Sequence, residues 1–359
     1  MCTQCNIQVN QAQSNQFAAK MMEMLNAGAL NLMTSIGYRT GLFDVLAEMD
    51  PATSGEIAQK AGLNERYVRE WLGAMATGNI VAYDAAQKTY ALPPEHAAWL
   101  TRKNSPNNIA VTAQWLAVMA EVEDRVVESF QKGGGLSYKE YSRFNEVMAD
   151  ESHQTVVTPL IDTLLPLVGG LKEKLEKGID VLDVGCGSGR ALITLAKAFP
   201  QSRFTGYDFL PAAIERAEDA ASREGLSNVA FTVRDASKID DREKFDLVLT
   251  FDAVHDQAKP DQVLKNIFNS LKKDGTYFCQ DIAGSSSVEN NMGHPLAPFL
   301  YTISTTHCMS VSLAQGGAGL GTMWGKELAC QMMKKAGFSS VQVKELEHDV
   351  INYYYIVKK

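Results

Sequence analysis

Apolar residues follow two different periods along this 359-residue chain, and the change lies near residue 178. Before it, apolar residues recur every three or four positions, which is the period of an amphipathic helix. After it, short apolar runs alternate with helical stretches, which is typical of strands and helices that form a parallel sheet. The sequence therefore predicts a mostly helical first part and an α/β second part.

The segment from Phe17 to Ile36 is expected to be a strongly apolar helix. Its apolar residues recur at mixed spacings of three and four and include Met21, Met24, Leu25, Leu30, Leu32 and Met33. So much apolar surface is not stable in water on an isolated helix. We therefore expect this helix to pack against another surface.

A helix-turn-helix pattern and a hairpin follow this helix. The first short helix begins at Ser54, and the second is capped by Asn64 and stops at Gly78. Two strand-like runs with a turn between them come next. These runs are residues 80–83 and 89–92. Together the four elements predict a winged helix.

The charges of the predicted winged helix do not favour nucleic-acid binding. Residues 54–92 contain four basic and four acidic side chains, and the whole chain carries a net charge of −8. A helix that reads a DNA groove needs several cations to neutralise phosphates. We expect this domain to serve in dimerisation or in lining an active site instead.

Three segments are predicted along the chain. Residues 17–105 form a winged-helix or dimerisation domain, 106–178 a helical linker and pocket wall, and 179–359 an α/β ligand-binding domain. The long, small-residue-rich segment 283–323 is expected to line the substrate pocket as a lid.

The start of the α/β domain combines a buried strand with a glycine-rich turn. The strand 179–184 leads into Gly185, Gly187 and Gly189, and a helix begins at Ala191. Glycines allow close approach of a ligand to the backbone, and helix-start amides favour polar or anionic groups. The spacing is one residue shorter than the GxGxxG dinucleotide pattern. A tight turn without a ligand remains the alternative.

Acidic residues stand at the ends of three successive predicted strands. Asp183 precedes the glycine turn, Asp208 ends the second strand, and Asp235 follows the third. In open α/β sheets, ligands bind beyond the carboxyl ends of the strands, where an acid can accept ribose hydroxyls. A single terminal Asp is often only a helix cap. Three beside a glycine turn predict a nucleoside site.

These motifs, taken together, resemble those of class I S-adenosylmethionine-dependent methyltransferases. They are VLDVGCGSGR at 181–190, Asp208, the Asp235-Ala236 pair and the strand 245–251. The N-terminal winged helix resembles that of small-molecule methyltransferases whose first domain dimerises. The resemblance implies a Rossmann-like seven-stranded α/β domain that binds S-adenosylmethionine and ends in an antiparallel hairpin. It also implies a homodimer.

The resemblance further implies roles for individual residues. Asp208 would hold the ribose, Phe209 would pack on the adenine, and Asp235 and Ala236 would bind the edge of the adenine. The methionine part would lie against the loop of Gly185, Cys186, Gly187 and Gly189 with the preceding Asp183, and Phe251 would flank it.

His255 is the predicted catalytic residue. It lies just past the fourth strand, in a segment that resembles the His-Asp stretch of plant-type O-methyltransferases, where the histidine is the base. A hydroxyl or thiol acceptor must lose a proton, and histidine titrates near neutral pH. The alternative is that His255 and Asp256 only cap or orient a loop. The remaining histidines, His96, His153, His294, His307 and His348, are expected to be structural.

The composition restricts the cellular setting. No apolar run approaches the ~18 residues of a membrane span, and no apolar signal-peptide region precedes or follows the first basic residue, Lys20. Six cysteines are too few for a disulfide framework. Cys2 and Cys5 form a lone CxxC, and no metal-ligand spacing accompanies it, so no metal site is predicted. We expect a cytoplasmic protein.

The sequence therefore predicts an enzyme that transfers a methyl group from S-adenosylmethionine to oxygen, sulfur or nitrogen of a small molecule. The alternative is a transcriptional regulator that senses S-adenosylmethionine and binds DNA through its winged helix. The motifs do not identify the methyl acceptor.

Overall fold

The computed structural model describes residues 9–347 and 349–359, so the predicted Cys2-Cys5 pair and His348 lie outside the described residues. The chain divides into two compact units, and the boundary lies between Ala117 and Val118. The sequence predicts boundaries at 105/106 and 178/179 instead. The structure groups the helices of residues 118–178 with the sheet because they pack their apolar residues, such as Leu160 and Leu175, into its core.

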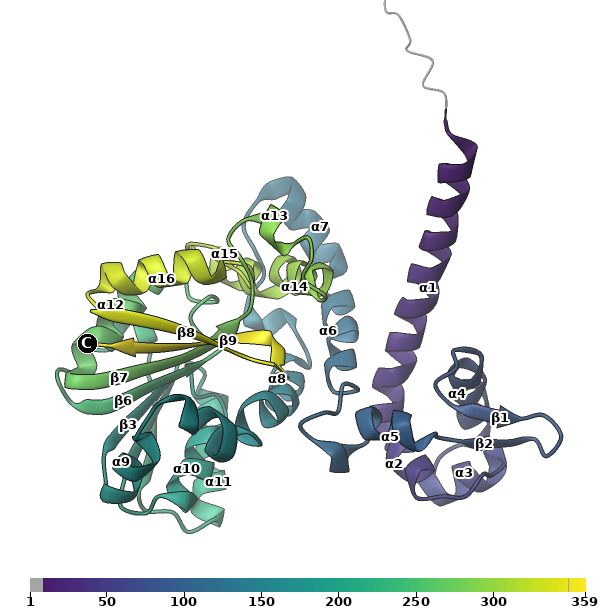
Figure 1. Ribbon diagram of the computed structural model, residues 1–359, viewed down its shortest axis with the longest axis horizontal. Coiled ribbons are helices and arrows are strands. Elements are labelled where there is room, and N and C mark those ends of the chain that lie inside the picture. Colours follow the sequence, from purple (N-terminus) through teal and green to yellow (C-terminus); the bar gives the residue numbers. More distant parts are fainter. Residues whose placement is uncertain (1–8, 348) are drawn as a thin grey trace, which may run out of the picture. The chain divides into compact units, whose positions relative to one another are not determined.

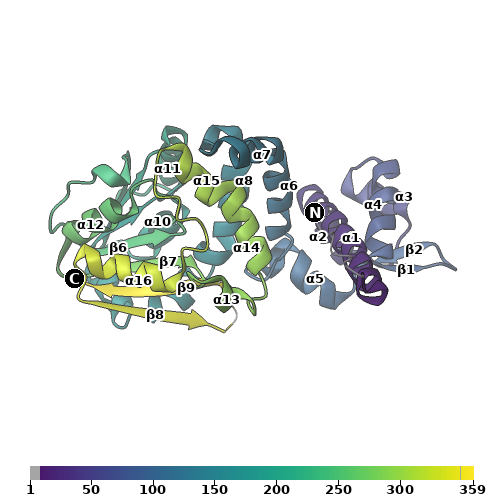
Figure 2. The same cartoon turned by 90° about the horizontal axis from the view of Figure 1, so that it is seen from above.

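The first unit is helical with a short hairpin, as the sequence predicts. Its elements are α1 (Gln11–Thr40), α2 (Leu42–Ala47), α3 (Ser54–Ala61), α4 (Glu65–Thr77), β1 (Ala82–Asp84), β2 (Thr89–Ala91), α5 (Pro94–Leu100) and the 3₁₀ turns Arg102–Asn104 and Thr112–Gln114. Figures 1 and 2 show the hairpin beside α3 and α4. The arrangement is that of a winged helix.

Local signals and one aromatic contact explain this unit. Thr53 and Glu56 cap α3 reciprocally, and Asn64 caps α4. Trp71 of α4 packs edge-on against Phe43, with 5.3 Å between the ring centroids. The Trp71 indole N–H also donates to the Met33 carbonyl oxygen at 2.8 Å, which fixes α4 against α1.

A seven-stranded sheet forms the centre of the second unit. The strand order is β5-β4-β3-β6-β7-β9-β8, and β9 runs opposite to the other six strands, so it pairs antiparallel with both β7 and β8. The strands are β3 (Asp180–Val184), β4 (Arg203–Asp208), β5 (Val229–Val233), β6 (Phe245–Phe251), β7 (Leu271–Ile282), β8 (Ser340–Leu346) and β9 (Asp349–Lys358). The order reverses between β3 and β6, which creates the crevice where such sheets bind ligands.

Helices cover both faces of this sheet (Figure 1). One face packs against α9 (Leu171–Lys177), α10 (Arg190–Ala198) and α11 (Pro211–Arg223), and the other against α12 (Pro260–Ser270) and α16 (Gly325–Ala336). Because both faces are buried, the central strands are nearly continuous apolar runs. The predicted α/β fold class is confirmed.

The remaining helices precede the sheet or interrupt it. They are α6 (Trp115–Glu121), α7 (Glu123–Lys132), α8 (Phe144–Ser152), α13 (Val288–Asn291), α14 (Ala297–Ile303), α15 (Met309–Ala314), the π-helical turns His153–Val157, Leu160–Leu164 and Ser304–Cys308, and the 3₁₀ turns Tyr138–Glu140, Leu165–Leu167 and Ala236–Lys238. None of the described helices is both long and apolar enough to span a membrane.

Strand β7 begins at Leu271, and its pairing with β6 has an irregularity between Phe245 and Leu247. The segment 283–323 is largely helical rather than a loop, since α13, α14 and α15 lie within it.

Candidate functional site

A cavity of about 630 Å³ lies in the second unit at the carboxyl ends of β3, β4 and β6. The glycine loop, the start of α11 and the residues after β6 line it from the side of the sheet. Residues of the 3₁₀ turn at Tyr138, of α8 and of the π-helical turn after α8 line it from the other side. Its volume is within the range of about 300–1,000 Å³ of small-molecule sites.

The glycine loop needs its glycines for two different reasons. Gly185, Gly187 and Gly189 all have positive φ, a conformation that other residues rarely adopt. A Cβ on Gly189 would lie 2.5 Å from the Phe231 ring, so this glycine allows the helix to pack on the sheet. A Cβ on Gly187 would meet no atom within 4 Å, so this glycine leaves the pocket wall open.

Asp208, at the end of β4, is hydrogen-bonded to the glycine loop. One carboxylate oxygen accepts from the Gly187 amide and the other from the Leu210 amide, both at 2.9 Å. Burial raises the pKa of Asp208, and these backbone donors oppose that rise. Each oxygen retains a lone pair for a further donor, such as a ribose hydroxyl.

Asp183 is a buried carboxyl group at the floor of the pocket. It is 2% exposed, and its Oδ1 atom has no hydrogen-bond partner among the described residues. Burial, reinforced by the nearby Asp208, raises the pKa of Asp183 to about 8. An unpaired buried carboxyl is costly unless a ligand supplies a donor or a positive charge. The residue therefore fits the amino group of a bound ligand.

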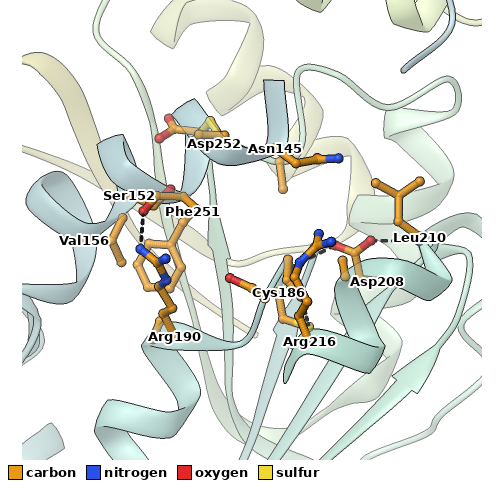
Figure 3. A pocket seen from close by; sticks show the side chains of 18 of the residues that line it. Asn145, Ser152, Val156, Cys186, Arg190, Asp208, Leu210, Arg216, Phe251 and Asp252 are labelled. Carbon is orange, nitrogen blue, oxygen red and sulfur yellow. Dashed lines mark hydrogen bonds between the residues drawn. The ribbon is translucent and has the colours of Figure 1, made fainter. Parts of the chain in front are cut away.

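Figure 3 shows that polar groups lie on two sides of Cys186. Asp208 and Arg216 are on one side, and Arg190 is on the other with Val156. Arg190 donates from Nη1 to the carbonyl oxygen of Ala149 in α8 at 2.8 Å. The pocket thus has one end, at Asp208, that suits the hydroxyls of a nucleoside and a second, positively charged end at Arg190.

Aromatic rings form the cover of the pocket. Tyr138 lies edge-on against Phe209 and against Phe144, with ring centroids 5.5 and 5.7 Å apart. Phe144 stacks on the buried imidazole of His307 at 3.8 Å. These contacts give the cavity flat apolar walls, which suit planar groups.

His255 lies behind this wall and is hydrogen-bonded to an acid. Its Nδ1 is 2.7 Å from Asp281 Oδ1, at the end of β7, and Asp281 also accepts from the Trp324 indole N–H at 3.1 Å. His255 Nε2 faces Asp256 Oδ1 at 3.2 Å. Burial opposes protonation, but Asp281 and Asp256 outweigh it and hold the pKa of His255 well above its usual value.

Asp256 connects His255 with the pocket. It lines the cavity and accepts a hydrogen bond from the Tyr138 hydroxyl at 3.1 Å. Potential metal-ligand atoms of His255, Asp256 and Cys308 lie within 4.8 Å of one another. Since both imidazole nitrogens already face carboxylates, we interpret this group as a hydrogen-bonded cluster, and the absence of a metal site stays a prediction.

Asp252 is a strained residue in the pocket wall. Its φ is +50°, and its Oδ1 has no hydrogen-bond partner within the described ranges. Burial, with the nearby Asp281, raises the pKa of Asp252 to about 8. Strain of this kind is concentrated at functional sites.

The structure brings most of the predicted residues together. Those that line the cavity are Asp183, Gly185, Cys186, Gly187, Asp208, Phe209 and Phe251. Gly189, Asp235, Ala236 and His255 do not line it. Asp235 instead caps the 3₁₀ turn at 236–238, accepting from the Ser237 amide at 2.9 Å, and pairs with Lys238 at 3.2 Å. No residue of 283–323 lines the cavity either.

Four residues of the site were not selected from the sequence. Arg190, Tyr138 and Asp252 line the cavity, and Asp281 holds His255. Three of them had a local signal, because Arg190 directly follows the glycine loop, and Asp252 and Asp281 stand at strand ends like the other acids. Tyr138 carries no comparable signal.

Family comparisons agree with this geometry. Residues 28–102 match the Rv2258c-like winged HTH domain, and residues 175–337 match a methyltransferase domain. The chain therefore carries a methyltransferase domain, in agreement with its resemblance to class I S-adenosylmethionine-dependent methyltransferases. The order of the seven-stranded sheet, with β9 running opposite to the other six strands, is consistent with this match.

The first curated relatives match less than half of this chain. The malonyl-[acyl-carrier protein] O-methyltransferase of Bacillus cereus is 28% identical over 145 residues, which cover 40% of this chain and 47% of that protein. The chain spans about half the length of the curated relatives that it matches.

Solved structures show the same fold over nearly the whole chain. Human N-acetylserotonin methyltransferase in complex with S-adenosylmethionine has a TM-score of 0.71 at 16% identity, covering 96% of this chain and 98% of that one. An O-methyltransferase family protein from Burkholderia thailandensis has a TM-score of 0.69 at 15% identity, with 95% and 98% covered.

Proposed function

We propose that this protein transfers the methyl group of S-adenosylmethionine to a small-molecule acceptor. The observation that carries the proposal is the pocket itself, in which the open backbone at Gly187, the Asp208 carboxylate and the unpartnered Asp183 face one cavity. These groups fit a nucleoside with hydroxyls at one end and an amino group at the other. The family assignment supports the same cofactor.

Each end of the cofactor has proposed contacts. Asp208 would accept the ribose hydroxyls and Phe209 would pack on the adenine, while Asp183 would accept from the amino group. The loop residues Gly185 and Cys186 would lie along the methionine part. The proposed roles of Gly189 at the loop, Asp235 and Ala236 at the adenine edge, and Phe251 beside the methionine part rest on the family resemblance.

S-adenosylmethionine, when bound, supplies an electrophilic methyl group for an in-line displacement. The protein must align the acceptor and exclude water, and the aromatic cover of Tyr138 and Phe144 serves both needs. For an oxygen or sulfur acceptor a proton must also leave. A nitrogen acceptor in its neutral form needs no base before the transfer.

We propose His255 as the general base for such an acceptor. Asp281 fixes its Nδ1, so that Nε2 is the nitrogen that takes the proton. Asp256 and Tyr138 connect this nitrogen with the cavity, because Asp256 contacts His255 and also lines the pocket. His255 must lose its own proton before it acts, since its pKa lies well above the usual value.

Binding and transfer are tested separately. We expect calorimetry to show one site for S-adenosylmethionine and for S-adenosylhomocysteine, and the absence of both would refute the proposal. Incubation with labelled S-adenosylmethionine and a pooled metabolite extract, followed by mass spectrometry, should reveal a small methylated product. Binding without transfer to any small molecule would favour a sensor instead.

Asp208→Ala should weaken S-adenosylhomocysteine binding in the same calorimetric assay. The variant removes a charged hydrogen-bond acceptor, which is worth about 1.5–3 kcal/mol. Asp240→Asn, at an exposed acid, is the control and should bind like the wild type. Equal affinities of Asp208→Ala and wild type would exclude Asp208 as the ribose ligand.

The winged helix does not favour the regulator alternative. In α4, Arg69 pairs with Glu65 at 2.5 Å, and Arg66 pairs with Glu70. These ion pairs use the cations that a DNA-reading helix would need. We propose that the first unit serves in homodimerisation, supported by exposed apolar side chains on α1. The cytoplasm remains the proposed compartment, supported by the free thiols of Cys186, Cys279, Cys308 and Cys330.

A further inference from the structure

Arg190 stands at the end of the pocket opposite to Asp208. It is the first residue of α10 and directly follows the glycine loop. In Figure 3 Arg190 lies on the same side of Cys186 as Val156, whereas Asp208 and Arg216 lie on the other side; Phe251 lines the same cavity. If Asp208 holds the ribose, Arg190 faces the amino-acid part of the cofactor.

Arg190 is the basic residue that lines the cavity at the end away from Asp208. Three arginines line the cavity, but Arg216 and Arg223 both belong to α11, seven residues apart on the side of Asp208. In the described part of the chain, none of the three forms an ion pair with an acid. The carboxylate of an amino-acid ligand therefore has one cationic partner next to the glycine loop.

The guanidinium of Arg190 is already oriented but not saturated. One donor is used by the Ala149 carbonyl oxygen at 2.8 Å. A guanidinium has five N–H donors in a rigid fork, and two parallel donors bind a carboxylate well. Arg190 can thus bind a ligand carboxylate without giving up its bond to α8.

An acidic and a basic side chain stand at the two ends of the glycine loop. Asp183 precedes the loop and Arg190 follows it, and both line the same cavity. An α-amino acid carries an ammonium and a carboxylate on one carbon atom. Asp183 and Arg190 are therefore placed to bind the ammonium and the carboxylate, respectively, of an amino-acid group on the ligand.

We propose that Arg190 binds the α-carboxylate of the cofactor and couples it to α8. This inference rests on the proposed function and deepens it. The pocket then selects nucleosides whose 5′ side chain ends in an amino acid over those with a short neutral side chain. Since Asn145, Met148, Ala149 and Ser152 of α8 line the cavity, the bound carboxylate also holds this cover in place.

Two nucleosides separate this inference from the proposed function. S-adenosylhomocysteine has the amino-acid group, and 5′-methylthioadenosine lacks it but keeps the adenosine. We expect Arg190→Gln to weaken binding of S-adenosylhomocysteine by about 10- to 100-fold, the range for a lost charged hydrogen bond. Its affinity for 5′-methylthioadenosine should stay within about twofold of the wild type.

The matched control removes a different arginine of the same cavity. Arg223→Gln should leave the ratio of the two affinities unchanged, because both ligands carry the adenosine. Equal effects of Arg190→Gln on both ligands, or no effect on either, would overturn the inference. A wild-type protein that binds neither nucleoside would refute the proposed function instead. Arg190→Lys, which keeps the charge but not the fork, should weaken S-adenosylhomocysteine less than the glutamine variant does.

Hydrogen exchange of the wild type tests the coupling to α8 without a variant. We expect S-adenosylhomocysteine to protect the amides of residues 144–157 from exchange, and 5′-methylthioadenosine at equal saturation to protect them clearly less. Equal protection by the two ligands would show that the carboxylate does not reach α8. In Arg190→Gln the difference between the ligands should disappear.

Discussion

Asp183 and Asp208 are buried carboxyl groups on neighbouring strands, and the protein keeps them close despite their mutual repulsion. Burial and the charge of Asp208 raise the pKa of Asp183 to about 8. Only one of the two has its oxygens matched by backbone donors. Asp183 therefore weakens the folded state when it ionises, as expected for a group kept for binding rather than for stability.

Asp183→Asn should stabilise the protein in alkaline solution. The folded-state pKa is raised above the unfolded one, so the wild type loses stability as the pH rises from about 4 through about 8. The asparagine does not titrate. We expect similar melting temperatures at pH 4 and below and, at pH 9, an advantage of at least ~1 kcal/mol for the variant.

The same substitution should weaken S-adenosylmethionine binding, because it removes the charge that faces the amino group. Calorimetry of the two proteins at pH 7, where the amino group of the ligand is protonated, measures this. Parallel melting curves of wild type and variant across the pH range would show that Asp183 is not the unpaired acid described above.

His255 is the second residue whose charge state decides its role. The ring is faced by Asp281 on β7, by Asp256 on its own loop and by Cys308 on the π-helical turn. The two carboxylates raise its pKa well above the usual value. The histidine is therefore protonated at neutral pH unless a cation enters the site, and a bound sulfonium would favour the neutral base.

The methylation rate should rise with pH above neutrality until His255 has lost its proton. Asp281→Asn removes a negative charge and so lowers the pKa of His255, which shifts the rising limb of kcat/KM to lower pH. Its maximum should also fall, because the ring loses its orienting partner. The measurement uses the acceptor found in the metabolite extract, with Asp261→Asn at an exposed acid as control. A pH-independent rate in the wild type would contradict the role of His255 as base.

At the scale of elements, the sequence predicts what short-range signals determine. The strands of the sheet lie within a few residues of their expected positions, because buried parallel strands are apolar runs between glycines and acids. The glycine loop and Asp208 meet as expected, since consecutive parallel strands place their carboxyl ends at one edge. Asn64 caps α4 as predicted.

Contacts between distant segments were not predictable in this way. Asp281 of β7 contacts His255 of the loop after β6, and Tyr138 contacts Asp256, which lies 118 residues later in the chain. No sequence spacing predicts either contact. The small residues of segment 283–323 predict a lid over the pocket. The segment instead forms helices, and its His307 packs against Tyr138, which lines the pocket. Asp235, by contrast, keeps the ordinary role of a cap.

Two glycines of one loop should respond differently to alanine. Gly189→Ala places a Cβ 2.5 Å from the Phe231 ring at a positive φ, so we expect a loss of about 1–3 kcal/mol in stability. Gly187→Ala meets no atom, so it should cost about 1 kcal/mol from its backbone strain alone.

The ligand affinity should show the opposite order. The methyl group of Gly187→Ala projects where the pocket is open, so S-adenosylhomocysteine binding should fall more in this variant than in Gly189→Ala. Thermal melting and calorimetry of both variants provide the comparison. Equal stability losses would mean that the contact of Gly189 with Phe231 does not limit the packing.

At the scale of the whole molecule, α1 is the element whose packing within its own unit is incomplete. Only Ser35 and Gly37 of its 30 residues are buried. Its exposed large side chains include Phe17, Met21, Met24, Leu25, Leu32 and Ile36. Contiguous apolar surface of this kind marks an interaction site. A second copy of the chain is the partner that the family resemblance implies.

Leu25→Glu should therefore dissociate the proposed dimer. Leu25 is 67% exposed in its own unit, and burying such a side chain contributes about 1.5–3 kcal/mol. In a two-fold interface the substitution occurs twice and two carboxylates must be desolvated. We therefore expect the dissociation constant of the proposed dimer to rise by more than about 100-fold. Asn26→Glu introduces the same charge at the next position, away from the row formed by residues 17, 21, 25, 32 and 36, and should leave the dimer intact. Sedimentation at micromolar concentration compares the three proteins. A wild type that sediments as a monomer would mean that the apolar side of α1 is covered within one chain.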